Sequence, residues 1–228
     1  RDCSIQRNHQ KMIEESPSAA VSPELREKMG HAAVTAAKAA GYVNAGTIEF
    51  LLEPDGKFWF MEMNTRIQVE HPVTEWVTGI DLVKEQLKIA SGMPLEIAQE
   101  DVRIQGHAIE CRINAENPQK NFRPSPGTIQ GAHLPGGNGI RVDTCVYNGC
   151  KIPPYYDSML AKLIVHAGNR KEAIAKMQSA LGEVIIDGID TNIDYQYEIL
   201  KDEDYQSGNF DTGFLASHII AGVKINEN

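Results

Sequence analysis

Segment 61–70 alternates chemically active side chains with mostly apolar ones. Its active side chains are Glu62, Asn64, Arg66, Gln68 and Glu70. Successive side chains of an extended strand point to opposite faces, so these five polar groups would line one face. An ordinary amphipathic strand with one solvated face shows the same alternation. However, two carboxylates, two amides and a guanidinium can together bind a metal ion and an anion, and this combination favours an active site.

A hairpin supplies a partner for this row. Residues 46–53 and 57–64 are strand-like and flank a Pro-Asp-Gly turn signal at 54–56. A two-residue or four-residue loop places Glu49 opposite Glu62, whereas a three-residue loop would break that register. Directly opposed Cβ atoms lie about 4.5–5.5 Å apart, and like charges there repel. We therefore expect a raised pKa or a divalent cation at this pair.

Glu49, Glu62 and Asn64 form an oxygen-only ligand set. Such ligands suit Mg²⁺ or Mn²⁺ rather than Zn²⁺, and a small set suits a metal that is also bound by nucleotide phosphates. The seven histidines include no pair at the i, i+4 spacing of a helical metal site, which argues against zinc chemistry. The competing interpretation is a surface cross-strand pair that binds nothing.

Arg66 and Gln68 follow on the same face and could hold a small planar anion, the Arg by two parallel hydrogen bonds. Glu70 could then act as a general base if burial raises its pKa. The alternative for Glu70 is a salt bridge with Arg66 or Arg112.

Arg112 lies on a predicted strand, 107–114, and shares its face with Ala108 and Glu110. Arg in such a place is usually part of a structural ion pair. The polar cluster at 6–11 includes Gln6, His9 and Lys11 and could meet a nucleotide, although a solvated loop is the simpler interpretation. The sequence contains neither a Gly-rich phosphate loop nor a G-x-S-x-G nucleophile motif.

Capping and turn signals predict the remaining elements. Ser22 caps a helix at 23–40 that Gly41 ends. The other predicted elements are a helix at 81–91, strands at 141–147 and 158–167, helices at 169–183 and 191–201, and loops with short strands over 117–139. Strands that precede helices in the second half are typical of an α+β domain.

Composition narrows the class of protein. The chain has 228 residues, 42% of them hydrophobic, and a net charge of −9. This length suits one large or two modest domains, and the negative charge argues against nucleic-acid binding through a broad basic surface. We expect a cytoplasmic protein, because no apolar run spans a membrane, no signal peptide is visible and the four cysteines are scattered. The start at Arg1 instead of Met is typical of a fragment or a processed piece.

The sequence resembles biotin carboxylases, specifically the C-terminal half of the biotin carboxylase subunit of bacterial-type acetyl-CoA carboxylase. The resemblance covers essentially the whole chain. It rests on RDCSIQR at 1–7, EMNTRIQVEHP at 62–72, GHAIECRINAE at 106–116 and PPYYDSM at 153–159. It implies an α+β chain in which residues 1–103 complete an ATP-grasp domain and residues 104–228 form the biotin carboxylase C-terminal domain.

The resemblance also implies a reaction in which MgATP and bicarbonate carboxylate biotin on a carrier protein. Glu49, Glu62 and Asn64 would hold the Mg²⁺ or Mn²⁺ ions that bridge the ATP phosphates. The residues implied to bind bicarbonate are Lys11, Arg66, Gln68, the backbone of Val69, and Glu70. Gln6 and His9 would contact the ribose, and Leu51 the adenine.

The implied catalytic residues are Glu70, Arg66 and Arg112. Glu70 would deprotonate bicarbonate for attack on the γ-phosphate, forming carboxyphosphate. The phosphate released from it would take the proton of biotin N1, and Arg112 would bind biotin and stabilise its enolate. Such roles fit phosphoryl transfer, which depends on positioning and charge neutralisation.

The family's N-terminal half, with its lid domain and phosphate-binding lysines, has no counterpart here, so the chain alone is expected to be inactive. The implied partners are the biotin carboxyl carrier protein, carboxyltransferase subunits and a second copy in a homodimer. The complex would supply malonyl-CoA for fatty acid synthesis. Two alternatives remain: the same half of a propionyl-CoA or pyruvate-type carboxylase, and a non-catalytic dimerisation module.

Overall fold

The computed structural model describes residues 1–225, so the last three residues of the predicted second domain, 226–228, lie outside the described residues. The helices are α1 (Pro23–Ala39), α2 (His71–Thr78), α3 (Leu82–Ala90), α4 (Arg170–Glu183), α5 (Ile193–Lys201), α6 (Glu203–Ser207) and α7 (Phe214–Ser217), with 3-10 turns at Gln99–Asp101 and Pro118–Lys120. The longer strands are β1 (Asp2–Arg7), β2 (Gln10–Ser16), β3 (Thr47–Leu52), β4 (Phe58–Asn64), β5 (His107–Asn114), β10 (Ile140–Thr144) and β12 (Met159–Ala167). The short strands are β6 (Glu116–Asn117), β7 (Arg123–Pro124), β8 (Gly127–Thr128), β9 (Gly131–His133), β11 (Lys151–Ile152), β13 (Ile185–Asp187), β14 (Ile219–Ile220) and β15 (Val223–Lys224).

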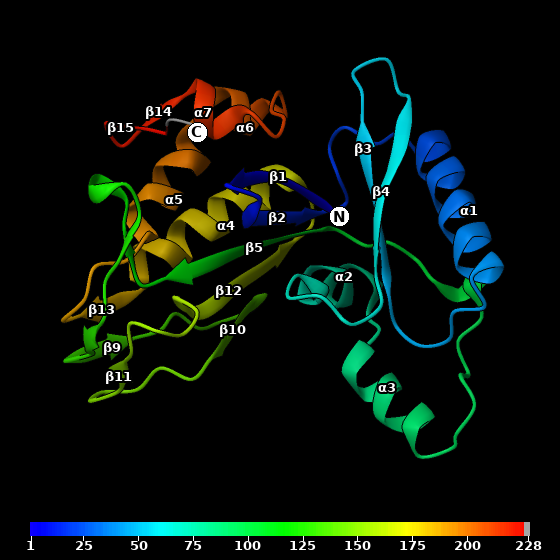
Figure 1. Cartoon of the computed structure of the whole chain (residues 1–228), viewed down its shortest axis with the longest axis horizontal. Coiled ribbons are helices and arrows are strands. Elements are labelled where there is room, and N and C mark those ends of the chain that lie inside the picture. Colours follow the sequence, from blue (N-terminus) through cyan, green and yellow to red (C-terminus); the bar gives the residue numbers. More distant parts are fainter. Residues whose placement is uncertain (226–228) are drawn as a thin grey trace.

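A five-stranded antiparallel sheet forms the centre of the molecule, with strand order β1-β2-β5-β12-β10 (Figure 1). The hairpin β1–β2 therefore pairs with a strand that begins about ninety residues later in the chain. The sheet contains strands from both sides of residue 103, and the predicted division of the chain there stays a prediction.

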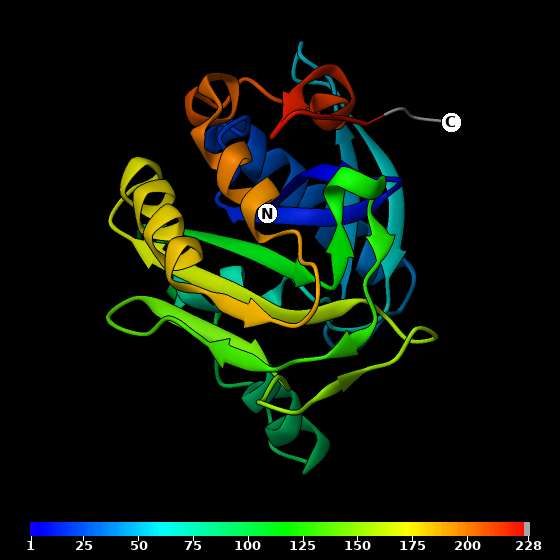
Figure 2. The same ribbon diagram turned by 90° about the vertical axis from the view of Figure 1, so that its left-hand side faces the viewer.

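One face of the sheet carries the main hydrophobic core. Ile109, Cys111 and Ile113 of β5 point to this face, where α4 and α5 cover them (Figures 1 and 2). The alternate residues of β5 point to the opposite face, and there Ala108 packs with Val73 and Val77 of α2. Since Glu110 and Arg112 share the face of Ala108, the fold places two charged side chains of β5 on the side of α2.

The hairpin β3–β4 stands beside the central sheet, next to α1 (Figure 1). Glu49 pairs with Glu62, as predicted. The reason differs, because the loop has three residues: the N–H of Glu53 donates to the carbonyl of Lys57, which closes the loop at 54–56. Met61 is then an extra residue on β4, a β-bulge that restores the register at Glu49.

The row at 61–70 is not one strand, contrary to prediction. β4 ends at Asn64, and the chain then turns irregularly until α2 begins at His71. The N–H and the Nδ1 of His71 both lie within hydrogen-bond distance of the Gln68 carbonyl, at 3.2 and 2.8 Å, which fixes this turn. Gln68 and Glu70 are consequently buried instead of lining a solvated face.

The other predicted elements agree closely with the structure. The helices predicted at 23–40, 81–91, 169–183 and 191–201 are α1, α3, α4 and α5, and the strand at 107–114 is β5. The strands at 141–147 and 158–167 are β10 and β12, the former shorter at its end. The side chains of Ser22 and Asn169 cap α1 and α4 as expected. The sequence did not predict β1, β2 or α2.

The four cysteines are free thiols. Cys111 lies in the core, whereas Cys145 is exposed. Within residues 1–225, no helix combines the length and the apolar character that crossing a membrane requires.

Candidate active site

Glu49 on β3 is the point at which three hydrogen-bond donors converge. Its Oε1 accepts from the Lys11 ammonium at 2.7 Å, from the Gln68 amide at 2.6 Å and from the Asn64 amide at 3.1 Å. The sequence led us to expect that the Glu49–Glu62 pair would need a raised pKa or a cation. In the structure, a lysine ammonium and two side-chain amides supply positive charge and dipoles to Glu49, and the expectation of a cation at this pair stays a prediction.

The proposed metal ligands lie together at this end of the site. The Asn64 amide donates to both Glu49 and Glu62, the latter at 2.8 Å, so all three oxygen-bearing side chains meet at the pairing of β3 with β4. Glu62 is exposed, whereas Glu49 and Asn64 are half-buried. The donor set therefore fits a hard cation that keeps part of its coordination for water or phosphate oxygens.

Glu70 lies between two cations. Its Oε1 is 2.7 Å from the Lys11 ammonium, and its Oε2 is 2.9 Å from the Arg112 guanidinium. Only 2% of Glu70 is exposed, so these charges act on it with little screening by water. The salt bridge with Arg112, one of the two alternatives for Glu70, is confirmed.

The condition stated for Glu70 as a general base, a pKa raised by burial, is not met in this arrangement. Burial alone would raise it, but the hydrogen bond and the charge of Lys11 outweigh burial and hold the pKa below its usual range, with further help from a backbone hydrogen bond and Arg1. In this arrangement Glu70 is ionised and paired with Lys11 and Arg112.

Arg66 does not pair with Glu70. Its guanidinium instead donates to the Asn64 side-chain oxygen at 3.2 Å and to the Ile67 carbonyl at 3.2 Å. Because Arg66 is exposed, its remaining donors can reach an anion from solvent.

Gln68 and Val69 each accept a hydrogen bond from a cationic side chain. The side-chain oxygen of Gln68 accepts from Arg1 at 2.6 Å, which orients its amide towards Glu49. The carbonyl of Val69 accepts from the Lys162 ammonium at 3.0 Å. The backbone before Glu70 is thus anchored to the central sheet.

Two of the residues predicted to contact the nucleotide lie on strands that also carry predicted site residues. Gln6 is the cross-strand partner of Lys11, and Leu51 follows Glu49 by two residues on β3. Both strands place these side chains next to predicted site residues. His9 lies in the exposed turn between β1 and β2.

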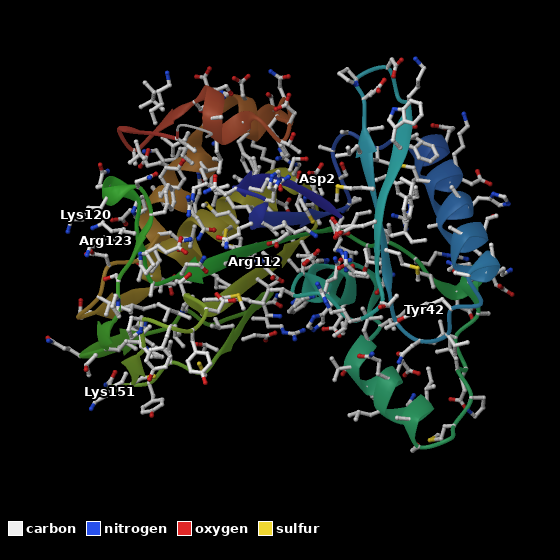
Figure 3. The ribbon with its side chains drawn as sticks, viewed as in Figure 1. Asp2, Tyr42, Arg112, Lys120, Arg123 and Lys151 are labelled. Carbon is white, nitrogen blue, oxygen red and sulfur yellow. The ribbon has the colours of Figure 1, made fainter. Side chains whose placement is uncertain are left out.

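Glu14 of β2 is a site residue that the sequence did not reveal. Its Oε1 accepts from Arg112 Nε at 2.6 Å, and it is fully buried. Arg112 is therefore clamped by Glu14 on one side and by Glu70 on the other (Figure 3 labels Arg112 on β5). Burial raises the pKa of Glu14 to about 7, and the nearby Arg112 charge opposes that rise.

Lys162 and Arg1 were also missed. Lys162 is the cross-strand partner of Arg112 in the β5–β12 pairing, and Arg1 is the first residue of the RDCSIQR run. Only the strand register could have indicated Lys162, because the sequence gives no direct sign of which strands are neighbours.

Comparison with known proteins defines the class. Residues 1–98 match the family model for the carbamoyl-phosphate synthase L chain ATP-binding domain, and residues 110–217 match the model for the biotin carboxylase C-terminal domain. The chain belongs to the biotin carboxylase family, and the predicted combination of an ATP-grasp part with this C-terminal domain is confirmed.

Among curated relatives, the chain is 59% identical to Biotin carboxylase 1 of Bacillus subtilis over 97% of this chain and 50% of that protein. It is 57% identical to a pyruvate carboxylase subunit of Methanothermobacter thermautotrophicus, over 94% of this chain and 44% of that protein. The chain thus spans about half the length of the curated relatives it matches.

A solved structure with the same fold is the biotin carboxylase domain dimer of the Hydrogenobacter thermophilus 2-oxoglutarate carboxylase, in complex with MgADP, ADP and bicarbonate. Its TM-score to this chain is 0.93 at 52% identity, and the match covers 95% of this chain and 48% of that one.

Proposed function

We propose that this chain is part of an ATP-dependent biotin carboxylase, a ligase that uses bicarbonate to carboxylate biotin on a carrier protein. The observation that carries the proposal is the position of Lys11, whose ammonium joins Glu49 to Glu70. One side chain thereby links a cluster suited to a metal and phosphates with a buried base. The complex of MgADP and bicarbonate with the 2-oxoglutarate carboxylase domain supports this assignment.

The nucleotide end consists of β3, β4 and the β1–β2 turn. Glu49, Glu62 and Asn64 would hold Mg²⁺ or Mn²⁺, which when bound neutralises phosphate charge and orients the phosphates. Beside them, Gln6 and His9 would contact the ribose, and Leu51, which is 51% exposed, would offer an apolar surface to the adenine.

The bicarbonate end consists of Lys11, Arg66, Gln68, the Val69 backbone and Glu70. A bicarbonate ion that binds the Lys11 ammonium in place of Glu70 would remove the main cause of the low pKa of Glu70. Glu70 would then become a stronger base at the moment when its substrate is in place, and bicarbonate deprotonated by it would attack the γ-phosphate to give carboxyphosphate. Substrate binding would thus switch on the base.

Arg112 would act in the second half of the reaction. Its guanidinium is held by Glu14 and reaches Glu70, at the inner end of the bicarbonate residues. After carboxyphosphate breaks down and the released phosphate takes the proton of biotin N1, Arg112 would stabilise the negative oxygen of the biotin enolate. The fixed position of Arg112 means that little reorganisation is needed.

The variant Glu70→Gln of the full-length gene product tests the proposed function. Bicarbonate-dependent ATP hydrolysis and biotin carboxylation should both fall by about 10²-fold or more, because an amide cannot accept the proton. The matched control is Glu75→Gln, since Glu75 is a nearly buried carboxylate on α2 that pairs with Arg141. Carboxylation by Glu70→Gln at the wild-type rate would refute the assignment of the base.

We further propose that the full protein belongs to an acetyl-CoA carboxylase complex. That complex would produce malonyl-CoA for fatty acid synthesis. The curated relatives include both a biotin carboxylase and a pyruvate carboxylase subunit. In the proposed complex, the carrier protein and the carboxyltransferase subunits would decide the acceptor. Carboxylation rates on the carrier protein of an acetyl-CoA carboxylase and on that of a pyruvate carboxylase would distinguish the two types. A preference for the second carrier would overturn the acetyl-CoA assignment.

The division of labour within the chain is part of the proposal. Residues 1–103 would complete the ATP-grasp domain, and residues 104–228 would form the C-terminal domain that supplies Arg112. The full protein would act in the cytoplasm as a homodimer, and the 228-residue chain alone would be inactive for lack of the remaining nucleotide-binding residues. The dimer in the solved 2-oxoglutarate carboxylase structure supports a homodimer.

A further inference from the structure

Glu110 is a buried carboxyl group that the proposed reaction does not use. It lies on β5, two residues before Arg112, and is 0% exposed. Among the described residues, neither of its carboxyl oxygens has a hydrogen-bond partner. An ionised carboxylate in such a place is very costly, and the usual response is for it to keep its proton.

A second buried carboxyl group lies directly across the sheet. Glu14 is the register partner of Glu110 in the β2–β5 pairing and is also 0% exposed. Opposed Cβ atoms in antiparallel strands lie about 4.5–5.5 Å apart. Two carboxylates at that separation oppose each other's ionisation, so the pair retains a proton that one isolated carboxyl group would lose.

The surrounding charges determine which group is ionised. Glu14 is hydrogen-bonded to Arg112, whereas Glu110 has no such partner, so the negative charge belongs on Glu14. Lys162 of β12 is the remaining nearby cation, and its ammonium is engaged by the Val69 carbonyl and by Asp143 at 3.3 Å.

Glu70 is the other nearby anion, and it already shares Arg112 and Lys11. From α2, the apolar Val73 and Val77 pack on this face of the sheet. The titratable groups of α2 are His71 and Glu75, which lie 3.9 Å apart, and Glu75 pairs with Arg141. Burial and the charge of Glu14 raise the pKa of Glu110 well above its usual range, against the opposing charges of Lys162 and Arg112.

We propose that Glu110 is a positioning residue that holds one proton in a carboxyl pair with Glu14. The retained proton thereby leaves Arg112 free to pair with Glu70 and to bind the substrate. The inference rests on the function proposed above. While Glu110 is neutral, the Arg112 charge is divided between Glu14 and Glu70. Loss of the proton adds a negative charge behind Arg112, draws its guanidinium towards the sheet and weakens the positive potential that attracts bicarbonate.

The predicted signature is an alkaline limb in the pH profile. In the full-length protein, kcat/KM for bicarbonate should fall as pH rises through the pKa of the carboxyl pair. Glu110→Gln replaces the protonated acid by a neutral amide of the same shape. Its rate at neutral pH should stay within about threefold of wild type, and its alkaline limb should move up by about one pH unit or more.

A matched control is Glu15→Gln, which also removes a buried carboxyl group from β2. Glu15 points to the opposite face, where it bonds to His107 and Arg170. This variant should keep the wild-type alkaline limb even if it is less stable. An alkaline limb that is the same in Glu110→Gln as in wild type would overturn the positioning role.

Infrared spectroscopy provides a readout that does not depend on activity. Wild-type protein at neutral pH should show the carbonyl stretch of a protonated buried carboxyl group, absent in Glu110→Gln and present in Glu15→Gln. A wild-type spectrum without that band, or a band that persists in Glu110→Gln, would overturn the shared proton. Failure of the proposed function is distinguishable, because a wild-type protein without bicarbonate-dependent ATP hydrolysis would leave the infrared result intact.

Discussion

At the scale of single residues, the site is governed by how a few cations are shared among several carboxylates. Lys11 forms salt bridges with Glu49 and Glu70, and Arg112 forms salt bridges with Glu14 and Glu70. Each carboxylate is therefore sensitive to the loss of one cation, and the pKa of Glu70 is lowered chiefly by Lys11.

Replacement of Lys11 by Met should raise the pKa of Glu70. The acid limb of kcat/KM for bicarbonate should move up by about one pH unit, and the rate should fall by about 10²-fold, because the charge that holds the anion is also lost. Lys84→Met, an exposed change on α3, is the control and should leave both quantities unchanged. An acid limb that does not move in Lys11→Met would show that Lys11 does not set the basicity of Glu70.

Glu110 should make stability depend on pH. Its pKa in the folded state is raised above the ordinary value of 4.5. As pH rises above 4.5, the unfolded chain loses this proton first, so the folded state binds more protons and becomes less stable with increasing pH. The unfolding free energy of Glu110→Gln relative to wild type, measured in urea, should therefore increase between about pH 5 and about pH 8. A difference that stays constant across that range would contradict a raised pKa.

At the scale of elements, Arg170 at the start of α4 joins the helical layer to the sheet. Its guanidinium bonds to the buried Glu15 of β2 and to the carbonyls of Tyr205 and Gln206, and it lies over the Tyr205 ring. One side chain therefore links α4, α6 and β2.

Replacement of Arg170 by Met should destabilise the protein by about 3 kcal/mol, because Glu15 would stay buried with His107 as its remaining partner. The neighbouring Lys171 is exposed, and Lys171→Met should change stability by no more than about 0.5 kcal/mol. Urea unfolding of both variants measures the difference. Equal stabilities for the two variants would show that the Arg170 network contributes nothing net.

Gly106 is required where β5 begins. Its φ is +67°, and an added Cβ would lie 2.2 Å from the Ala167 carbonyl oxygen at the end of β12. Gly106→Ala should cost about 2 kcal/mol or more through backbone strain and this clash. Gly30→Ala is the matched control, since open space surrounds Gly30 in α1 and the change should stabilise by about 0.5–1 kcal/mol. Thermal unfolding that ranks the two variants in the opposite order would contradict this role for Gly106.

Local signals predicted most of the elements but not their partners. Capping residues gave α1 and α4, and alternating or apolar runs gave β5 and β12. The strand β2 carries five consecutive buried residues, Met12 to Ser16, so neither alternation nor hydrophobicity identified it. The motif resemblance named Arg112 as a site residue, but its partner Glu14 lies 98 residues away, and only tertiary structure brings the two together.

At the scale of the whole molecule, the hairpin β3–β4 exposes several large apolar side chains. Leu51, Trp59, Phe60 and Met61 are between 47% and 60% exposed, which is unusual for a protein surface in contact with water. Leu51 and Trp59 are cross-strand partners and share the face of Glu49 in the proposed nucleotide site, whereas Phe60 pairs with Phe50 on the opposite face of the hairpin.

Two measurements on the 228-residue chain by itself would distinguish a catalytic half from a dimerisation module. Light scattering would give its oligomeric state, and a calorimetric titration with MgADP would give its nucleotide affinity. For a catalytic half that needs the remaining residues, we expect MgADP binding at least about tenfold weaker than that of the full-length protein. Dimer formation by a chain that binds no MgADP at all would favour the dimerisation module.

The pairing of β2 with β5 also has a consequence for how the protein is made. Ile13 must find Cys111, so the central sheet is dominated by contacts between residues far apart in the chain, and such sheets fold slowly. During synthesis, the β1–β2 hairpin has an unpaired edge until β5 has left the ribosome. An unpaired edge favours aggregation. The Glu14–Arg112 ion pair forms only when β2 and β5 have paired, so a chain trapped before that step would contain both residues without the contact that fixes Arg112.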